Sequence, residues 1–149
     1  MAIPKLVADF REFLKLLGSN HVEYLLIGGY AVGVYGYVRA TNDLDVWVRM
    51  SVVNAANLER ALRAFGFESA DAALFLEAGN IVRMGVPPIR IEILTTISGA
   101  DFDACFEERS LVDMDGLTVP VISLARLRQN KAVAARAKDL ADLENLPEA

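Results

Sequence analysis

The chain has 149 residues, of which 54% are hydrophobic and 23% charged, and its formal net charge is −5. This length allows one domain with a buried core, and the acidic balance argues against a protein that follows a nucleic-acid backbone by bulk charge. The single cysteine, Cys105, excludes an internal disulfide and favours the reducing cytoplasm. The longest uncharged run, residues 24–38, is shorter than the roughly 20 residues that cross a bilayer, so we expect no membrane partner.

Hydrophobic periodicity and turn residues predict alternating helices and strands. We expect helices over residues 4–17, 30–37, 51–65, 100–106 and 123–146. Strands are expected over residues 22–27, 42 or 43–49, 81–84, 89–94, 110–114 and 117–121. Residues 71–77 fit either a short helix or an irregular link. This order predicts an α/β (α+β) fold with a mixed central sheet and flanking helices, because several neighbouring strands are joined by short turns.

Two aspartates stand on one face of the second predicted strand. Asp43 and Asp45 alternate with Leu44, Val46 and Val48, so the apolar residues face one side and the carboxylates the other. Like charges two residues apart on a strand repel each other unless a cation lies between them. Because Mg²⁺ is usually held by one or two carboxylates plus substrate phosphates, the pair is a candidate metal site. Its alternative is a turn cap at Asp43 and a solvated strand face at Asp45.

The first predicted strand ends at Gly28-Gly29 and opens a helix. Glycines there let backbone N–H groups approach a phosphate closely. The simpler explanation is a turn that needs positive φ, and both explanations can hold at once. With one histidine and one cysteine, the chain offers no Ser-His-Asp triad and no Cys/His zinc site.

Ile27-Gly28-Gly29, a spacer of thirteen residues and then Asp43-Leu44-Asp45 resemble the signature of the DNA polymerase β-like nucleotidyltransferase superfamily. The local form is similar to the minimal nucleotidyltransferases of bacteria and archaea, above all the abortive-infection type found in toxin–antitoxin modules. The resemblance implies a single nucleotidyltransferase-like domain over residues 1–149, with a nucleotidyltransferase fold and a C-terminal helix.

The superfamily places a third acid on an adjacent strand, and Glu92 matches that position. It lies mid-strand on the polar face of residues 89–94, and the two-metal form of this chemistry needs ligands from more than one strand. Glu92 would be a metal ligand or a general base for the attacking hydroxyl. The alternative is a salt bridge with Arg90 on an exposed sheet face.

Arg39 and Thr41 match an Arg-x-Thr that precedes the aspartates in the resembled group. A loop arginine beside a metal site is well placed for a nucleotide phosphate, because its fork matches phosphate oxygens. A plain surface arginine is the competing explanation.

Lys131 and Lys138 belong to a segment that again resembles the abortive-infection type, in which such a lysine meets nucleotide phosphates. On one continuous helix they would share a face, about 10 Å apart along the axis, with Val133 and Leu140 on the opposite face. A solvated helix face with Lys–Asp pairs is the alternative.

The resemblance implies an enzyme, dependent on Mg²⁺ or Mn²⁺, that moves a nucleoside monophosphate from a nucleoside triphosphate such as ATP to a hydroxyl acceptor. It allows a protein side chain, an RNA 3′ end or a small molecule as acceptor, and a cognate toxin or antitoxin as partner. The alternative is an inactive protein of the same fold that binds a partner. The nucleobase, the acceptor and the oligomeric state are left open by the sequence.

Overall fold

The structure is a computed structural model that describes residues 5–41 and 43–149. Its helices are α1 (Ala8–Ser19), α2 (Gly28–Val34), α3 (Val52–Phe65), α4 (Phe102–Glu107), α5 (Leu124–Ala134) and α6 (Ala137–Asn145), with a short 3-10 helix, η1 (Ala72–Phe75). Its strands are β1 (Tyr24–Ile27), β2 (Asp43–Val48), β3 (Ile81–Val86), β4 (Ile89–Leu94), β5 (Ser110–Met114) and β6 (Leu117–Val121).

The strands form one six-stranded sheet in the order β3-β4-β2-β1-β6-β5. The pairs β1–β2, β3–β4 and β5–β6 are antiparallel, whereas β2–β4 and β1–β6 are parallel. This arrangement confirms the predicted mixed sheet and α+β class. Strand β2 lies inside the sheet, between β1 and β4, so its side chains have neighbours on both sides.

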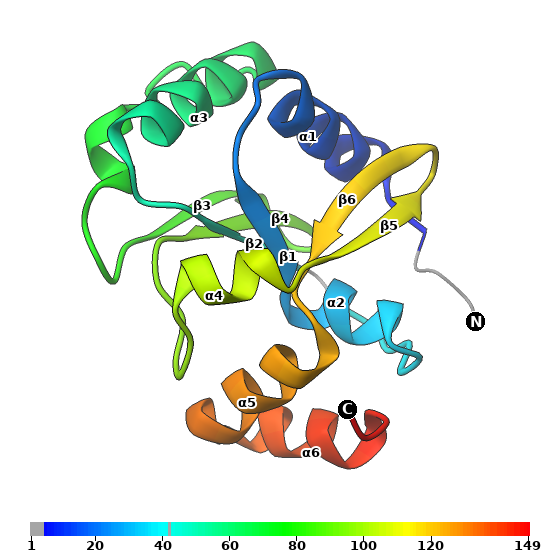
Figure 1. Cartoon of the computed structure of the whole chain (residues 1–149). Coiled ribbons are helices and arrows are strands. Elements are labelled where there is room, and N and C mark those ends of the chain that lie inside the picture. The colour runs from blue at the N-terminus through cyan, green and yellow to red at the C-terminus, as the bar shows by residue number, and fades with distance from the viewer. Residues whose placement is uncertain (1–4, 42) are drawn as a thin grey trace.

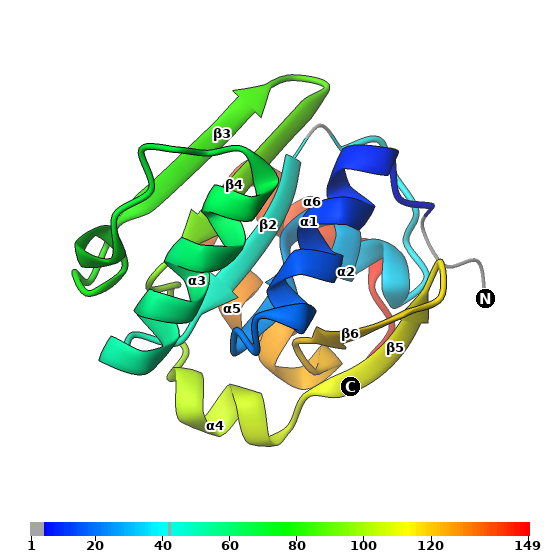
Figure 2. The same ribbon diagram turned by 90° about the horizontal axis from the view of Figure 1, so that it is seen from above.

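Helices cover both faces of the sheet (Figure 1). Helices α1 and α3 lie side by side over one face, as the view from above shows (Figure 2), and α5 and α6 lie beyond the other. Alternation along β2 buries Leu44, Val46 and Val48 completely, which leaves its two aspartates on the side of α5 and α6. The candidate site is therefore on that second face.

Several predicted boundaries agree with the structure. Ser51 caps α3 by accepting a hydrogen bond from the Asn54 amide, and Gly66 ends it with a left-handed φ of 108°. The first helix was expected over residues 4–17 but spans Ala8–Ser19, and residue 4 lies outside the described residues. The second helix begins at Gly28, two residues earlier than predicted, because the two glycines of the turn are already the first residues of α2.

The helical region predicted over residues 123–146 is present, but it consists of two helices, α5 and α6, and is not one continuous helix. Ala135 has a left-handed φ of 53°, and the chain folds back so that α6 packs against α5. In the structure Lys131 and Asp139 are buried, whereas Val133 and Leu140 are exposed. Buried ion pairs of Lys131 with Asp139 and Asp142 join the two helices.

None of the helices in the described part of the chain combines the length and apolar character that crossing a bilayer demands.

Candidate active site

A cavity of about 770 Å³ opens between the sheet and the α5–α6 hairpin. All nine residues that the sequence nominated as site residues line it: Gly28, Gly29, Arg39, Thr41, Asp43, Asp45, Glu92, Lys131 and Lys138. These residues come from five elements, α2, β2, β4, α5 and α6, and from the loop before β2, so the fold brings together residues that are up to 110 positions apart in the chain.

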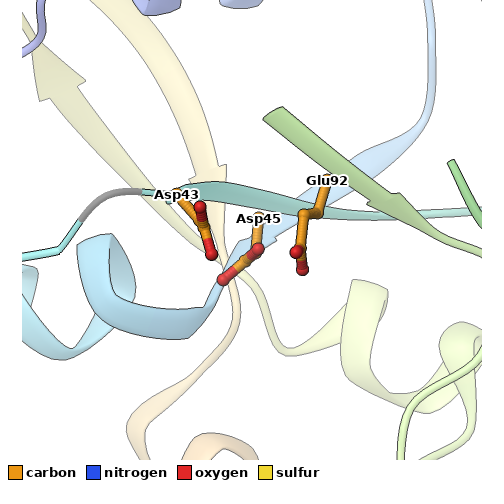
Figure 3. Close-up of side chains that lie close together, drawn as sticks. All are labelled: Asp43, Asp45 and Glu92. Carbon is orange, nitrogen blue, oxygen red and sulfur yellow. The ribbon is translucent and has the colours of Figure 1, made fainter. Parts of the chain in front are cut away.

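Three carboxylates from neighbouring strands converge in the cavity. In the parallel pairing of β2 with β4, Asp45 lies directly opposite Glu92. Asp43, Asp45 and Glu92 each offer a carboxylate oxygen, and these oxygens all lie within 4.8 Å of one another. Figure 3 shows the three side chains projecting to the same side of the two strands. An all-oxygen donor set of this kind suits a hard divalent cation.

Asp45 has a buried carboxylate oxygen, Oδ1, that lacks a hydrogen-bond partner among the described residues. Burial, followed by the negative charges of Glu92 and Asp43, raises the pKa of Asp45 to about 7. A buried, unpartnered carboxylate oxygen is costly in a folded protein, so the residues present fit a bound cation.

Gly28 is required where it stands for two separate reasons. Its φ of +69° lies in the left-handed region, which favours glycine. A Cβ atom at this position would lie 2.2 Å from Asp45 Oδ2, well inside van der Waals contact. The glycine turn therefore admits the carboxylate and places β1, α2 and the metal-site candidate in direct contact.

Gly29 and Thr41 meet on the other side of the same turn. A Cβ on Gly29 would lie 2.7 Å from Thr41 Oγ1 and 3.3 Å from Arg39 Nη1. Thr41 Oγ1 donates to the Asp43 backbone carbonyl at 3.3 Å. The loop that carries Arg39 and Thr41 thus packs directly against the glycines at the start of α2.

Two arginines that the sequence did not nominate as site residues contact the acids. Arg90 Nε and Nη2 donate to the two carboxylate oxygens of Asp43, both at 2.9 Å. Arg83 Nε donates to Glu92 Oε1 at 3.0 Å, and Arg90 Nη2 lies 3.4 Å from the same oxygen. The salt bridge weighed as an alternative for Glu92 therefore exists, and it coexists with the convergence of the three acids. The signal for Arg90 was its position two residues before Glu92 on the same strand face.

Lys131 and Lys138 have different surroundings because the helix breaks between them. Lys131 is buried, and its Nζ lies 3.2 Å from Asp139 Oδ1 and 3.1 Å from Asp142 Oδ2. Lys138 is exposed at the cavity wall, and its charge acts to lower the pKa of Asp45 against the dominant effect of burial. Of the two lysines, Lys138 is the one whose ammonium group is accessible to a ligand.

Asp139 and Asp142 are almost fully buried and were not nominated as site residues. Asp142 also accepts two hydrogen bonds from Arg39, and Asp139 accepts from Arg136. Nothing in the local sequence indicated the contact of Asp142 with Arg39, 103 residues away.

Neither a family model nor a curated protein sequence matches the chain. Several solved structures match it in fold. The proposed nucleotidyltransferase TM1012 from Thermotoga maritima matches with a TM-score of 0.64 and 16% identity, covering 95% of this chain and 94% of that one. The lincosamide antibiotic adenylyltransferase LnuA, solved with lincomycin bound, matches with a TM-score of 0.57 and 15% identity over 95% and 96% of the two chains.

The antibiotic-resistance factor ANT(2'')-Ia matches with a TM-score of 0.58 and 12% identity, covering 91% of this chain and 79% of that one. Identities of this size establish the fold and leave the reaction to be argued from the site. The sheet order, the glycine turn and these similarities agree with one another, and the chain has the nucleotidyltransferase fold.

Proposed function

We propose that this protein is a nucleotidyltransferase that moves a nucleoside monophosphate from a nucleoside triphosphate, such as ATP, to a hydroxyl group. The observation that carries the proposal is the convergence of Asp43, Asp45 and Glu92 within 4.8 Å in one cavity. Gly28 and Gly29 border the same cavity, in a fold shared with nucleotidyltransferases.

Asp43, Asp45 and Glu92 would hold Mg²⁺, or Mn²⁺ in its place. When bound, such a cation neutralises charge on the phosphate oxygens and on the leaving group. The unpartnered Oδ1 of Asp45 supports this assignment, because that oxygen lacks any donor in the described part of the protein. Glu92 has a second role open to it, as the base that takes the proton of the acceptor hydroxyl.

The other cavity residues would position the triphosphate. Arg39 and Lys138 would bind phosphate oxygens, and the glycine turn allows the nucleotide to lie close to the backbone. The acceptor oxygen would attack the α-phosphorus, the bond from that phosphorus to the bridging oxygen would break, and pyrophosphate would leave. Positioning and charge neutralisation supply most of the rate in transfers of this type.

Two observations support different classes of hydroxyl acceptor. LnuA is an adenylyltransferase for a lincosamide antibiotic, which supports a small-molecule acceptor. The resemblance of the Gly-Gly and Asp-x-Asp segments to the abortive-infection type supports a protein side chain or an RNA 3′ end, with a toxin or antitoxin as partner. Transfer assays with labelled nucleotide against each class distinguish them.

The primary test measures the change in melting temperature caused by each of the four nucleoside triphosphates, with and without Mg²⁺. We expect a Mg²⁺-dependent rise with at least one triphosphate, since a ligand at 100 times its Kd stabilises by about 2.7 kcal/mol. This ligand-induced rise should disappear in Asp43→Asn/Asp45→Asn and persist in Glu68→Gln, which changes an exposed acid in the turn after α3. Absence of any rise in the wild type would contradict the proposal.

A second candidate function is that of a partner-binding protein with an inactive site. The observation that favours it is the pairing of Arg90 with Asp43 and of Arg83 with Glu92, which neutralises two of the acids without a cation. Such a protein would bind Mg²⁺-nucleotide weakly, and Asp45→Asn would leave its biological effect unchanged. Transfer of label from an α-labelled triphosphate, lost in Asp45→Asn, would exclude this candidate.

A further inference from the structure

Asp142 makes an enclosed polar contact between the α5–α6 hairpin and the loop before β2. Its side chain is only 2% exposed. Its Oδ1 accepts from Arg39 Nε at 2.8 Å and its Oδ2 accepts from Arg39 Nη2 at 2.9 Å. This is the parallel, two-bond geometry that matches a guanidinium to a carboxylate and fixes its plane.

The contact determines which part of Arg39 remains available. Nε and Nη2 are occupied by Asp142, whereas Nη1 lies on the side of the glycine turn, 3.3 Å from where a Cβ on Gly29 would stand. Arg39 lines the cavity, and among the described residues Nη1 donates one long hydrogen bond, of 3.4 Å, to the Ala40 carbonyl. The guanidinium therefore presents one NH₂ group to the cavity in a fixed orientation.

Asp142 is also held in place by Lys131. Lys131 Nζ lies 3.1 Å from its Oδ2 and 3.2 Å from Asp139 Oδ1, and all three side chains are at most 5% exposed. Burial alone would raise the pKa of Asp142, but hydrogen bonds from Arg39 and Lys131 outweigh it and hold that pKa below its usual range. The carboxylate is thus charged, enclosed and unable to turn away from Arg39.

We propose that Asp142 is a positioning residue that holds Arg39 aimed at the triphosphate of the bound nucleotide. This inference rests on the proposed function and adds a buried residue of α6 to a site that already includes the exposed Lys138 of the same helix. It also gives Lys131 a role different from the phosphate contact implied by the resemblance: the lysine fixes Asp142, and Arg39 meets the ligand.

The test is a double-mutant cycle read by calorimetric binding of tripolyphosphate and of Mg²⁺-ATP. We expect Arg39→Gln and Asp142→Asn each to weaken binding roughly tenfold, and the double variant to bind no more weakly than Arg39→Gln alone. Such non-additivity would show that Asp142 affects ligand binding through Arg39. Retention of wild-type affinity by Asp142→Asn, or losses that multiply in the double variant, would overturn the inference.

Asp139→Asn is the matched control, since Asp139 is equally buried against Lys131 but does not contact Arg39. It should lower the melting temperature while keeping tripolyphosphate affinity. If Asp142→Asn fails to fold, Asp142→Glu replaces it, and the displaced carboxylate should still weaken binding in a variant with wild-type circular dichroism. Unaltered affinity in Asp142→Glu would count against the inference. A wild type that binds neither ligand would overturn the proposed function itself, whereas a wild type that binds both and ignores Asp142 overturns only the positioning role.

Discussion

Asp43 and Arg90 face each other across the parallel pair β2–β4, and the arginine donates to both oxygens of the carboxylate. A side chain proposed as a metal ligand is therefore already paired with a cation of the protein. Arg90 keeps the acids together when no metal is bound, because it also lies 3.4 Å from Glu92. It also competes with a divalent cation for the same oxygens.

This competition predicts the effect of Arg90→Gln. Mg²⁺ or Mn²⁺ should bind a few-fold more tightly, since the variant lacks both the competing guanidinium and a repelling positive charge. The gain is limited by solvent screening, because the side chains of this pair are 31% and 24% exposed. Calorimetric titration of the metal without nucleotide measures the change. Arg60→Gln on α3, beyond the opposite face of the sheet, is the matched control. Weaker metal binding by Arg90→Gln would show that Arg90 supports the site and does not compete for it.

Asp45 predicts a pH-dependent stability of the metal-free protein. Its pKa is raised to about 7 in the folded chain, mainly by burial, so between about pH 4 and 7 the folded state binds more protons than the unfolded state. The free energy of unfolding should therefore fall as pH rises through this window. Asp45→Asn removes this fall and should be more stable than the wild type at pH 8, by an amount on the order of a few kcal/mol.

Urea denaturation at pH 5 and pH 8, in the presence of a chelator, measures this difference. Glu68→Gln serves as the control, because its side chain is exposed and should leave the pH profile unchanged. Addition of Mg²⁺ at pH 8 should stabilise the wild type and not Asp45→Asn. A wild-type stability that rises between pH 5 and pH 8 relative to the variant would contradict the assignment.

Gly28 and Gly66 allow backbone strain to be separated from crowding. Both have left-handed φ values, +69° and +108°, but a Cβ on Gly28 would meet Asp45 Oδ2 at 2.2 Å, whereas nothing lies within 4 Å of one on Gly66. Both alanine variants should lose about 1–3 kcal/mol of stability through strain. Only Gly28→Ala should also displace Asp45 and weaken Mg²⁺ binding, by roughly tenfold or more.

Chemical denaturation and metal titration of the two alanine variants provide both quantities. Equal loss of metal affinity in Gly28→Ala and Gly66→Ala would mean that the effect comes from general destabilisation, and it would remove the case for a specific contact between Gly28 and Asp45.

Lys131 and Lys138 should differ sharply in their effect on stability. Lys131→Met leaves Asp139 and Asp142 buried and facing each other without their shared cation, a change that costs about 3–5 kcal/mol. Lys138→Met removes an exposed charge and should change stability by less than about 0.5 kcal/mol while weakening nucleotide binding. Urea unfolding and Mg²⁺-ATP titration of both variants test this, and a stable Lys131→Met would argue that the buried ion pairs are not formed.

The parts of the site that sequence analysis found are those encoded by short-range pattern. Alternation along β2 placed Asp43 and Asp45 on one face, and the glycines marked a turn that the structure confirms as one requiring positive φ at Gly28. The fold class followed in the same way, from periodicity and from turn residues such as Asp115-Gly116, both of positive φ in the structure.

The parts that were missed depend on contacts between distant segments. No glycine or proline in the sequence indicates the helix break at Ala135. The break is explained only by the burial of Lys131 against Asp139 and Asp142. The pairing of Arg39 with Asp142 spans 103 positions and leaves no local trace in the sequence. Helix periodicity assumes an apolar buried face, and here the buried face is charged.

The pairing of Asp45 with Glu92 across β2 and β4 determines how rigidly the two acids are held. Both strands lie in the interior of the sheet order, with hydrogen-bonded neighbours on each side. Backbone amides in such strands exchange with solvent chiefly through global opening, whereas loops and peripheral helices open locally at much lower free energy. The spacing of these two acids should therefore persist for as long as the native state does, while exposed side chains at the cavity wall, such as Lys138, reorient on a much faster timescale.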